Sequence, residues 1–289
     1  MMSSFLLFAL ALIANTLFIS STKADGAVSD RIRFQSLTLE DGLSQSTVYD
    51  ITEDRLGFMW FGTQDGLNRY DGVRFDQLRH ESHDSTTISS PTINQLLYDQ
   101  QNAVWVLTPQ GLDSVDIISL GITHWTQELK DVAVDTDSGD DTFQIHAVAL
   151  APDNKVVALT DHYLALISQD TASVTRLTQF DNILEDHKVS KFVLREDRVY
   201  LLEGSCIISV DMTGRDKNTE CLSSQLELLE LFVNPEDNDQ ILVTAEEGFA
   251  LFDTETEEQV ASFRYFPVMD GRSQNLARIR QLLPYKNGY

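Results

Sequence analysis

Short apolar runs alternate with polar turns over residues 47–78, and this stretch sets the pattern for the chain. The apolar runs read TVYDIT, FMWFGT, LNRY and VRFDQL, and they are rich in β-branched and aromatic residues. Asp-Gly pairs stand at 65–66 and 71–72, where they indicate tight hairpins. The pattern therefore predicts four short antiparallel strands.

The second of these strands is apolar on both sides. Phe58, Met59, Trp60 and Phe61 follow one another without a polar residue, so both faces of the strand should be covered. A sheet packed between two neighbouring sheets meets that need. The aromatic residues expected to fill the seams between such sheets are Trp60, Phe61, Trp105 and Trp125.

Fainter copies of the pattern follow down the chain. Trp105 lies 45 residues after Trp60, and later equivalent positions follow at spacings of 52, 43 and 42, through Leu112, Leu164, Ile207 and Phe249. Repeats of this length are typical of propeller blades. The sequence predicts an all-β propeller of four-stranded blades, about five of them in an incomplete ring, over residues 47–78, 92–126, 143–177, 189–223 and 226–266, with a sixth begun at 273.

A segment ahead of the first repeat resembles the end of a repeat. Residues 32–37 match residues 73–78 at a spacing of 41. We expect them to form an outer strand that completes the last blade and closes the ring. The predicted propeller segment therefore spans residues 32–289.

The first repeat resembles the two-component regulator propeller repeat. The residues that carry the resemblance are Gly42-Leu43-Ser44, the turn from Asp54 to Gly57, Trp60-Phe61-Gly62-Thr63, and Gly66-Leu67-Asn68-Arg69-Tyr70-Asp71-Gly72. The second repeat keeps only the Trp, the Thr and the Gly-Leu, with Leu107 where the family has Gly, and later repeats lack the Trp.

In that family the propellers form the periplasmic sensor part of membrane-spanning receptors. A histidine kinase or a diguanylate cyclase follows in the cytoplasm, after a membrane helix. The resemblance therefore implies a sensor that works as a homodimer and binds a small molecule or an oligosaccharide. It implies no chemistry and no cofactor for this chain, which we expect to be a fragment ending before the membrane helix.

The first 24 residues have the pattern of a signal peptide. An apolar run from Phe5 to Ile19 is followed by Thr22-Lys23-Ala24, which offers small residues at a cleavage site. An uncleaved anchor is the alternative. Either reading predicts export, and with the family resemblance it predicts a periplasmic location; any contact with a membrane comes from such an anchor or from parts that follow this chain.

The charge narrows the choice of partners. The chain carries 21 Lys and Arg against 45 Asp and Glu, a formal net charge of −24. No basic stripe is available to neutralise phosphates, which excludes nucleic acid and an anionic membrane surface as partners. The same acidity disfavours a sulfated or uronate-rich ligand.

Cys206 and Cys221 are the two cysteines of an apparently exported chain, so a disulfide is permitted. If residues 206–212 pair with 219–223, Val210 lies opposite Cys221, and this register disfavours a direct bridge. The sequence leaves the pairing open.

Candidate chemistry is sparse. Asp54, Asp65 and Asp71 resemble acid–base carboxylates of a propeller glycosidase or lyase, but all three stand where hairpins use Asp to bond the backbone. The His80–His83 segment is one residue short of a zinc spacing, and residues 135–141 only partly match a calcium loop. We predict no catalytic residue and no metal site, and keep a secreted hydrolase or lyase and a non-catalytic adhesion or scaffold propeller as alternatives.

A ligand site is expected on one face of the propeller. There the loops entering each first strand meet the turns joining second and third strands. The candidate ligand-binding residues on that face are Ser44, Gln45, Gln64, Asp65, Ser90 and Gln110.

Overall fold

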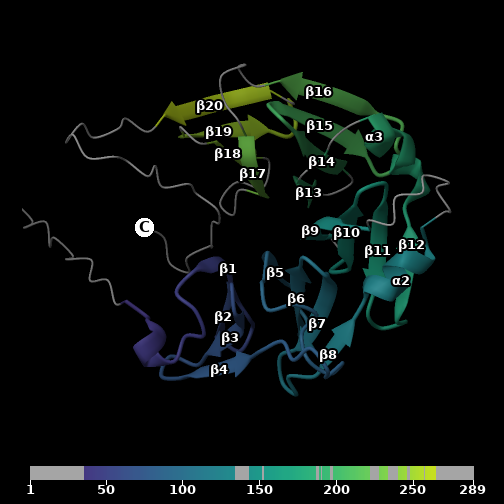
Figure 1. The fold of residues 1–289 in the computed structure, drawn as a ribbon. Helices are drawn as coiled ribbons and strands as arrows, with labels where there is room; N and C mark the ends of the chain where they lie inside the picture. Colours follow the sequence, from purple (N-terminus) through teal and green to yellow (C-terminus); the bar gives the residue numbers. More distant parts are fainter. Residues whose placement is uncertain are drawn as a thin grey trace, which may run out of the picture. The chain divides into compact units, whose positions relative to one another are not determined.

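The described residues form five four-stranded antiparallel sheets (Figure 1). The computed structural model describes residues 36–133, 143–151, 153–186, 189, 191–195, 198–221, 228–233, 240–245, 248–256 and 258–264. Contacts divide the chain after Ser36, and every element named below belongs to the unit that begins at Leu37. The predicted all-β fold of four-stranded blades is confirmed, and no described strand closes a ring. Of the predicted closing strand at 32–37, residues 32–35 lie outside the described residues, and Ser36 and Leu37 are not part of a strand. The sixth unit predicted from 273 also lies outside the described residues.

Each sheet is a meander in chain order, and we call the sheets blades 1 to 5. Blade 1 contains β1 (Val48–Glu53), β2 (Met59–Thr63), β3 (Gly66–Tyr70) and β4 (Phe75–Leu78). Blade 2 contains β5 (Gln95–Tyr98), β6 (Ala103–Thr108), β7 (Gly111–Asp116) and β8 (Ile122–His124). Blade 3 contains β9 (Ile145–Leu150), β10 (Val156–Thr160), β11 (Leu164–Ser168) and β12 (Ser173–Arg176).

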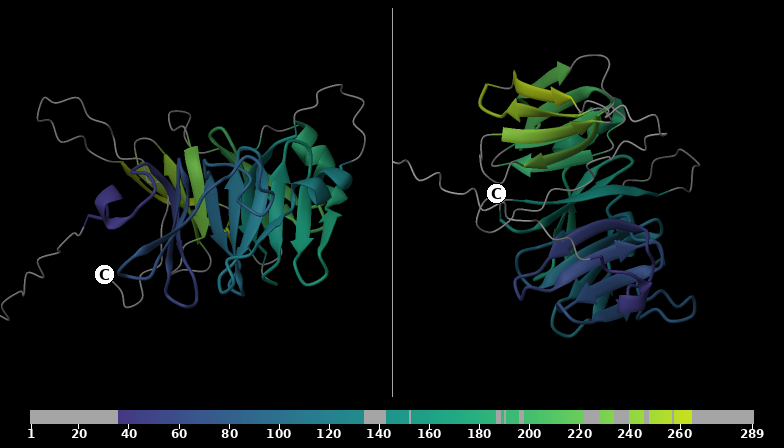
Figure 2. Two further views of the ribbon diagram at one scale, coloured as in Figure 1. Left: turned by 60° about the horizontal axis from the view of Figure 1, so that its bottom comes forward. Right: turned by 90° about the vertical axis from the view of Figure 1, so that its left-hand side faces the viewer.

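The last two sheets follow the same order. Blade 4 contains β13 (Lys191–Arg195), β14 (Arg198–Glu203), β15 (Cys206–Asp211) and β16 (Lys217–Cys221). Blade 5 contains β17 (Leu228–Val233), β18 (Gln240–Ala245), β19 (Gly248–Asp253) and β20 (Glu258–Arg264). The first strands β1, β5, β9, β13 and β17 contact one another in sequence, and Figure 2 shows the sheets standing side by side with the fourth strands outermost.

Short helices in the connections were not predicted. They are the 3-10 helices η1 (Leu39–Asp41) and η2 (Thr178–Phe180) and the α-helices α2 (Thr126–Asp131) and α3 (Asp181–Asp186). Each α-helix has six residues, too few for a helical period to stand out in the sequence. Leu129 and Phe180 are nevertheless fully buried, so these turns cap the seams between blades.

Four hydrophobic clusters fill the four seams between successive blades. Trp60 belongs to the cluster between blades 1 and 2, and Trp105 and Trp125 belong to the cluster between blades 2 and 3. Phe61 differs from the expectation. It points to the other face of blade 1 from Trp60, and its ring packs against Tyr70 and Phe75 of its own blade, with centroids 6.5 and 5.7 Å away.

The turns of blade 1 explain its acidic residues. Asp54 is buried, and its carboxylate accepts hydrogen bonds from the backbone N–H groups of Leu56 and Phe58. Asp71 accepts two backbone N–H bonds in the same way, as predicted.

Asp65 departs from that prediction, because its carboxylate pairs with Arg79 at 2.5 Å. The turn at Asp65 is held by Thr63, whose hydroxyl accepts from the Asp65 N–H and donates to the carbonyl of Gly66. Thr108 and Thr160 make the equivalent bonds in blades 2 and 3. Blade 3 therefore has the same turn as blades 1 and 2. The sequence did not indicate this turn, because the third repeat lacks the Trp that marks the first two.

The register predicted for the two cysteines is wrong. Cys206 lies directly opposite Cys221 in the β15–β16 pair, and the two form a disulfide. The expected hairpin placed its turn over residues 213–218, but β16 already begins at Lys217, opposite Val210. Asp211 makes this tighter turn, because its carboxylate accepts from the N–H groups of Arg215 and Asp216.

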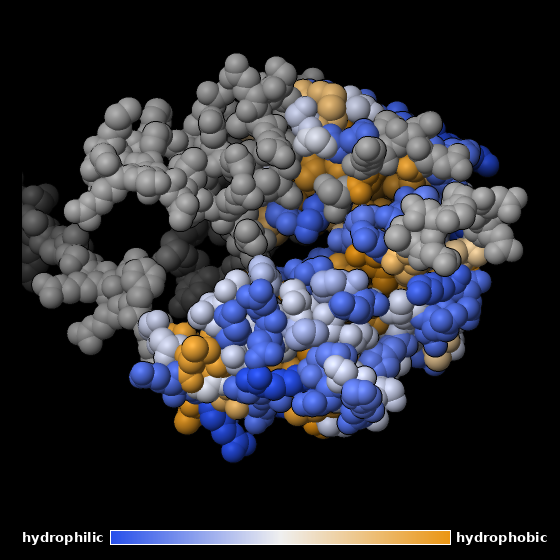
Figure 3. Space-filling model, in the orientation of Figure 1, coloured by the Kyte–Doolittle hydropathy of each residue, from blue (hydrophilic) through white to orange (hydrophobic). Residues whose placement is uncertain are grey.

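The face seen in Figure 3 is mostly hydrophilic, with hydrophobic residues showing chiefly between the sheets. This distribution fits the burial of the strands, since the middle strands β6, β7 and β10 are almost wholly buried and exposed positions lie on fourth strands such as β16.

Candidate functional site

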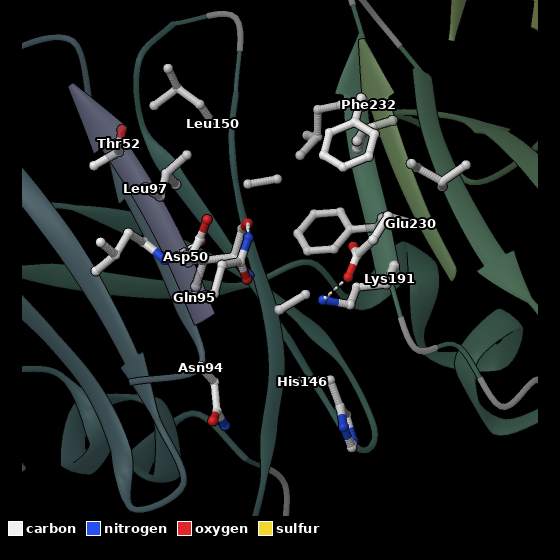
Figure 4. Close-up of a pocket in the computed structure, with 18 of the residues that line it drawn as sticks. Asp50, Thr52, Asn94, Gln95, Leu97, His146, Leu150, Lys191, Glu230 and Phe232 are labelled. Atoms are coloured by element: carbon white, nitrogen blue, oxygen red, sulfur yellow. Dashed lines mark hydrogen bonds and ion pairs between the residues drawn. The ribbon is translucent and has the colours of Figure 1, made fainter. Parts of the chain in front are cut away.

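A cavity of about 750 Å³ lies between the first strands of the five blades. All five inner strands contribute to its wall, and Figure 4 shows their side chains around it. Its volume falls in the range of small-molecule sites. We call it the axial cavity.

A β-bulge recurs where the inner strands begin. Tyr49 is an extra residue between the pairs Val48–Thr63 and Asp50–Gly62, and His146 is the extra residue at the same place in β9. In blade 2, Asn94 donates its N–H to the carbonyl of Leu107, the residue already paired with Gln95. Because a bulge turns two successive side chains toward one side, Tyr49, Asn94 and His146 line the cavity together with the residues that follow them.

One residue from each inner strand lies at the same height around the cavity. Asp50 pairs with Gly62, Gln95 with Leu107, Ala147 with Leu159, Lys191 with Leu202 and Glu230 with Thr244. These five positions are equivalent in register, and all five line the cavity. We call Asp50, Gln95, Ala147, Lys191 and Glu230 the ring positions.

Side chains at the ring positions link neighbouring blades. The Asp50 carboxylate accepts from the Leu96 N–H of blade 2 at 2.6 Å. The Gln95 carboxamide donates to the Val148 carbonyl at 2.9 Å and accepts from the Val148 N–H at 3.0 Å, across the next seam. Lys191 and Glu230 form an ion pair of 2.9 Å between blades 4 and 5.

The cavity wall changes the proton affinity of Asp50. Burial raises its pKa to about 6, against the bonds from the N–H groups of Leu96 and Ile51 and the charge of Lys191, which favour the ionised form. The Glu230 carboxylate adds a smaller upward push. The pKa of Asp50 is therefore closer to neutral pH than that of an ordinary carboxyl group.

The two ends of the cavity differ in polarity. Asn94 and His146 lie toward one end in Figure 4, and His146 is held by Asp161, whose carboxylate lies 2.7 Å from its Nε2. Leu97, Leu150 and Phe232 lie toward the other end. A ligand with a polar and an apolar part fits this arrangement.

The loop residues proposed from the sequence lie outside the cavity wall. Gln45 donates to the side-chain oxygen of Gln64 at 3.0 Å, and the Ser44 backbone N–H donates to Asn68. Ser90 is buried, and its hydroxyl accepts from the Thr92 N–H. Asp65 and Gln110 remain in their turns, and Gln110 is exposed. These six residues adjoin the strand ends at which the bulges occur, and their role in binding remains a prediction.

The weak metal patterns give no cluster in the part of the chain that the structure describes. The Nδ1 atom of His80 lies 2.7 Å from the carbonyl of Ile88 in the β4–β5 connection, so this residue serves the loop. The predicted calcium-like segment at 135–141 lies outside the described residues.

The ring positions could not be recognised from the sequence because they share no residue type. An Asp, a Gln, an Ala, a Lys and a Glu occupy one structural position. The only signal was the 45-residue spacing of Asp50 and Gln95, which equals that of Trp60 and Trp105.

Comparisons with known proteins agree with a propeller. The chain is similar to the extracellular domain of a hybrid two-component system of B. thetaiotaomicron, with a TM-score of 0.62 and 18% identity over 80% of this chain and 32% of that one. A streptogramin B lyase gives a TM-score of 0.55 at 12% identity, over 80% of this chain and 72% of the lyase. At these identities the likeness shows the fold alone.

Matches in sequence point to one class of propeller. Residues 42–65 match the family model of the two component regulator propeller, which confirms the resemblance seen in the first repeat. A 56-residue stretch is 54% identical to histidine kinase P4 of Formosa agariphila, which is 19% of this chain and 4% of that kinase. The described helices are all too short, or too polar, to cross a membrane.

Proposed function

We propose that this chain is the ligand-sensing propeller region of an exported two-component receptor. The observation that carries the proposal is the two component regulator propeller repeat at residues 42–65, in a fold whose inner strands enclose a cavity lined with polar groups. The propeller would bind a small molecule or an oligosaccharide in the axial cavity. Binding would favour one arrangement of a receptor homodimer over another, and so pass a signal to an output domain.

Export to the periplasm is part of this proposal. The Cys206–Cys221 disulfide supports it, because such bonds persist in oxidising compartments. The output domain would be a histidine kinase, as the similarity to the Formosa protein suggests, or a diguanylate cyclase.

The proposed role includes no chemistry. The buried carboxylate of Asp54 is occupied by two backbone N–H groups and the indole of Trp60, and Asp71 is occupied by its own turn. The cavity carboxylates Asp50 and Glu230 bond the adjacent blade and Lys191. Groups engaged in this way support binding and blade alignment better than acid–base turnover.

A thermal-shift screen of the purified protein tests the proposal. Small metabolites and neutral oligosaccharides serve as probes, and mass spectrometry follows each binder for turnover. Thr52 lines the cavity, so Thr52→Trp should abolish the binding of ligands that occupy its width by narrowing it. Thr123→Trp, on the exposed outer strand β8, is the matched control and should leave binding unchanged.

The screen separates the sensor from its rivals. A binder that is recovered intact and is lost in Thr52→Trp supports the sensor. Conversion of a binder to product would establish the hydrolase or lyase reading instead. Binding that survives in Thr52→Trp would remove the cavity from the proposal.

A further inference from the structure

Among the described residues, the seam between blades 3 and 4 lacks the side-chain link that the two preceding seams possess. Asp50 reaches Leu96 across the first seam, and Gln95 reaches Val148 across the second. The equivalent ring position at the third seam is Ala147, whose side chain ends at its methyl group. The wall of the cavity is therefore short of one polar group at this place.

The backbone that this missing group would meet belongs to Phe192. Leu96, Val148 and Phe192 each follow the ring position of their strand, and they pair with Val106, Ala158 and Leu201. In an antiparallel strand the N–H and C=O of one residue point to the same edge. Those of Phe192 thus face the edge that Gln95 bonds at Val148, and no side chain among the described residues bonds them.

We propose that a ligand of the axial cavity completes this seam by presenting an N–H and a C=O side by side to the backbone of Phe192. The ligand would donate to the Phe192 carbonyl and accept from its N–H, as the Gln95 carboxamide does at Val148. The inference rests on the proposed function, because it takes the cavity to be a binding site.

The geometry selects a chemical class. The N–H and the C=O must lie on the same side of the amide, as in a primary carboxamide or a lactam ring. A trans secondary amide, the form found in peptides and N-acetylated sugars, points the two groups to opposite sides and cannot make both bonds. The ion pair of Lys191 and Glu230 spans the next seam, and because Lys191 directly precedes Phe192 it gives the rest of the ligand a polar environment.

Matched pairs of probes test this class. Nicotinamide carries a primary carboxamide and uracil a lactam edge, and their controls are N-methylnicotinamide and 1,3-dimethyluracil. Titrations followed by the backbone amide signal of Phe192 should show binding of nicotinamide, uracil or both, and at least tenfold weaker binding of the methylated controls. The two parent probes distinguish a carboxamide ligand from a lactam. Equal binding of parent and methylated probes would overturn the proposal.

Two variants change which seam lacks a polar side chain at its ring position. Ala147→Gln supplies the group from the protein and should weaken probe binding at least tenfold. Gln95→Ala empties the equivalent place at Val148 and should add a second binding event, seen as a doubled stoichiometry and a shift of the Val148 amide signal. If Ala147→Gln does not fold, the Gln95→Ala result decides alone, and unchanged stoichiometry there refutes the inference.

The outcome also separates this inference from the proposed function. If Thr52→Trp abolishes the binding of other compounds while the carboxamide and lactam probes fail, the ligand class is wrong and the sensing role stands. If nothing that binds is sensitive to Thr52→Trp or to Ala147→Gln, both proposals fail.

Discussion

Two equivalent tryptophans differ in how their indole N–H is satisfied. The Trp60 N–H donates to the buried Asp54 carboxylate at 2.8 Å. The Trp105 N–H has no acceptor among the described residues, although Asp99 stands at the position equivalent to Asp54. The ring of Trp125 packs against Trp105, with centroids 5.4 Å apart, and donates its own N–H to Ser114.

The difference predicts unequal costs for the same substitution. Trp60→Phe removes a bond to a charged group and leaves a buried oxygen of Asp54 unpaired, whereas Trp105→Phe removes an N–H that is already unpaired. Both side chains are buried, so the lost apolar contact is similar. Urea unfolding should show Trp60→Phe to be the more destabilising change by about 1–3 kcal/mol. Equal losses would mean that Trp105 has an acceptor after all.

Sequence reasoning at this scale succeeded where one side chain serves its own turn. Asp54 and Asp71 were predicted correctly because the partner groups lie within four residues. It failed where the partner comes from elsewhere, as for Asp65 with Arg79.

The connection between blades 1 and 2, residues 79–94, is fastened by a buried carboxylate. Asp113 accepts from the N–H and the hydroxyl of Ser89 and from His124 Nδ1 at 2.6 Å. His124 Nε2 faces the carbonyl of Ser85 at 2.8 Å, so both ring nitrogens face acceptors. Burial disfavours the charged ring, but the bonds to Asp113 and Ser85, with the nearby Glu128 charge, outweigh it and raise the pKa of His124.

This fastening should depend on pH. A raised pKa means that protonated His124 stabilises the fold at low pH, and that this contribution is lost as the pH rises through the folded-state pKa. Hydrogen exchange at the Ser89 amide should show protection near pH 6 that falls by pH 8, beyond the intrinsic rate change. His124→Gln should have weak protection that does not vary with pH over this range.

His83→Gln provides the control for that experiment. His83 lies in the same connection and is exposed, so its replacement should keep the pH response of the wild type. A response that persists in His124→Gln would assign the effect to another group.

The elements themselves were largely readable from the sequence. Asp-Gly turns and alternating strands predicted the meanders of blades 1 and 2, and the spacing carried the prediction to blades 3 to 5. The bulges were not predicted because Tyr49, Asn94 and His146 share no residue type that would mark the position in the sequence. The cysteine register escaped because it depends on a turn made tighter by Asp211.

For the whole molecule the dominant feature is its negative charge. The net charge of −24 produces electrostatic repulsion that destabilises the compact state. Only 21 Lys and Arg side chains are present to offset 45 Asp and Glu. Buried hydrophobic clusters in the four seams stabilise the folded state against this repulsion.

Added salt should therefore stabilise the protein. We expect the melting temperature at pH 7.5 to rise by several degrees between about 0.02 and 0.3 M NaCl, because the Debye length shortens over this range. The rise should shrink at pH 4.5, where many carboxylates are protonated. A melting temperature that falls with salt at pH 7.5 would show that ion pairs outweigh the repulsion.

The bulges also determine how the lining of the axial cavity can vary. Each one absorbs a single inserted residue in the backbone, so pairs such as Tyr49-Asp50, Asn94-Gln95 and His146-Ala147 line the cavity while the strand pairing that follows is kept. A substitution in such a pair changes the cavity wall, and at the ring position it also changes the contact with the next blade. Related propellers can acquire different ligand specificities through substitutions in these pairs, blade by blade, without a change in the four-stranded sheets.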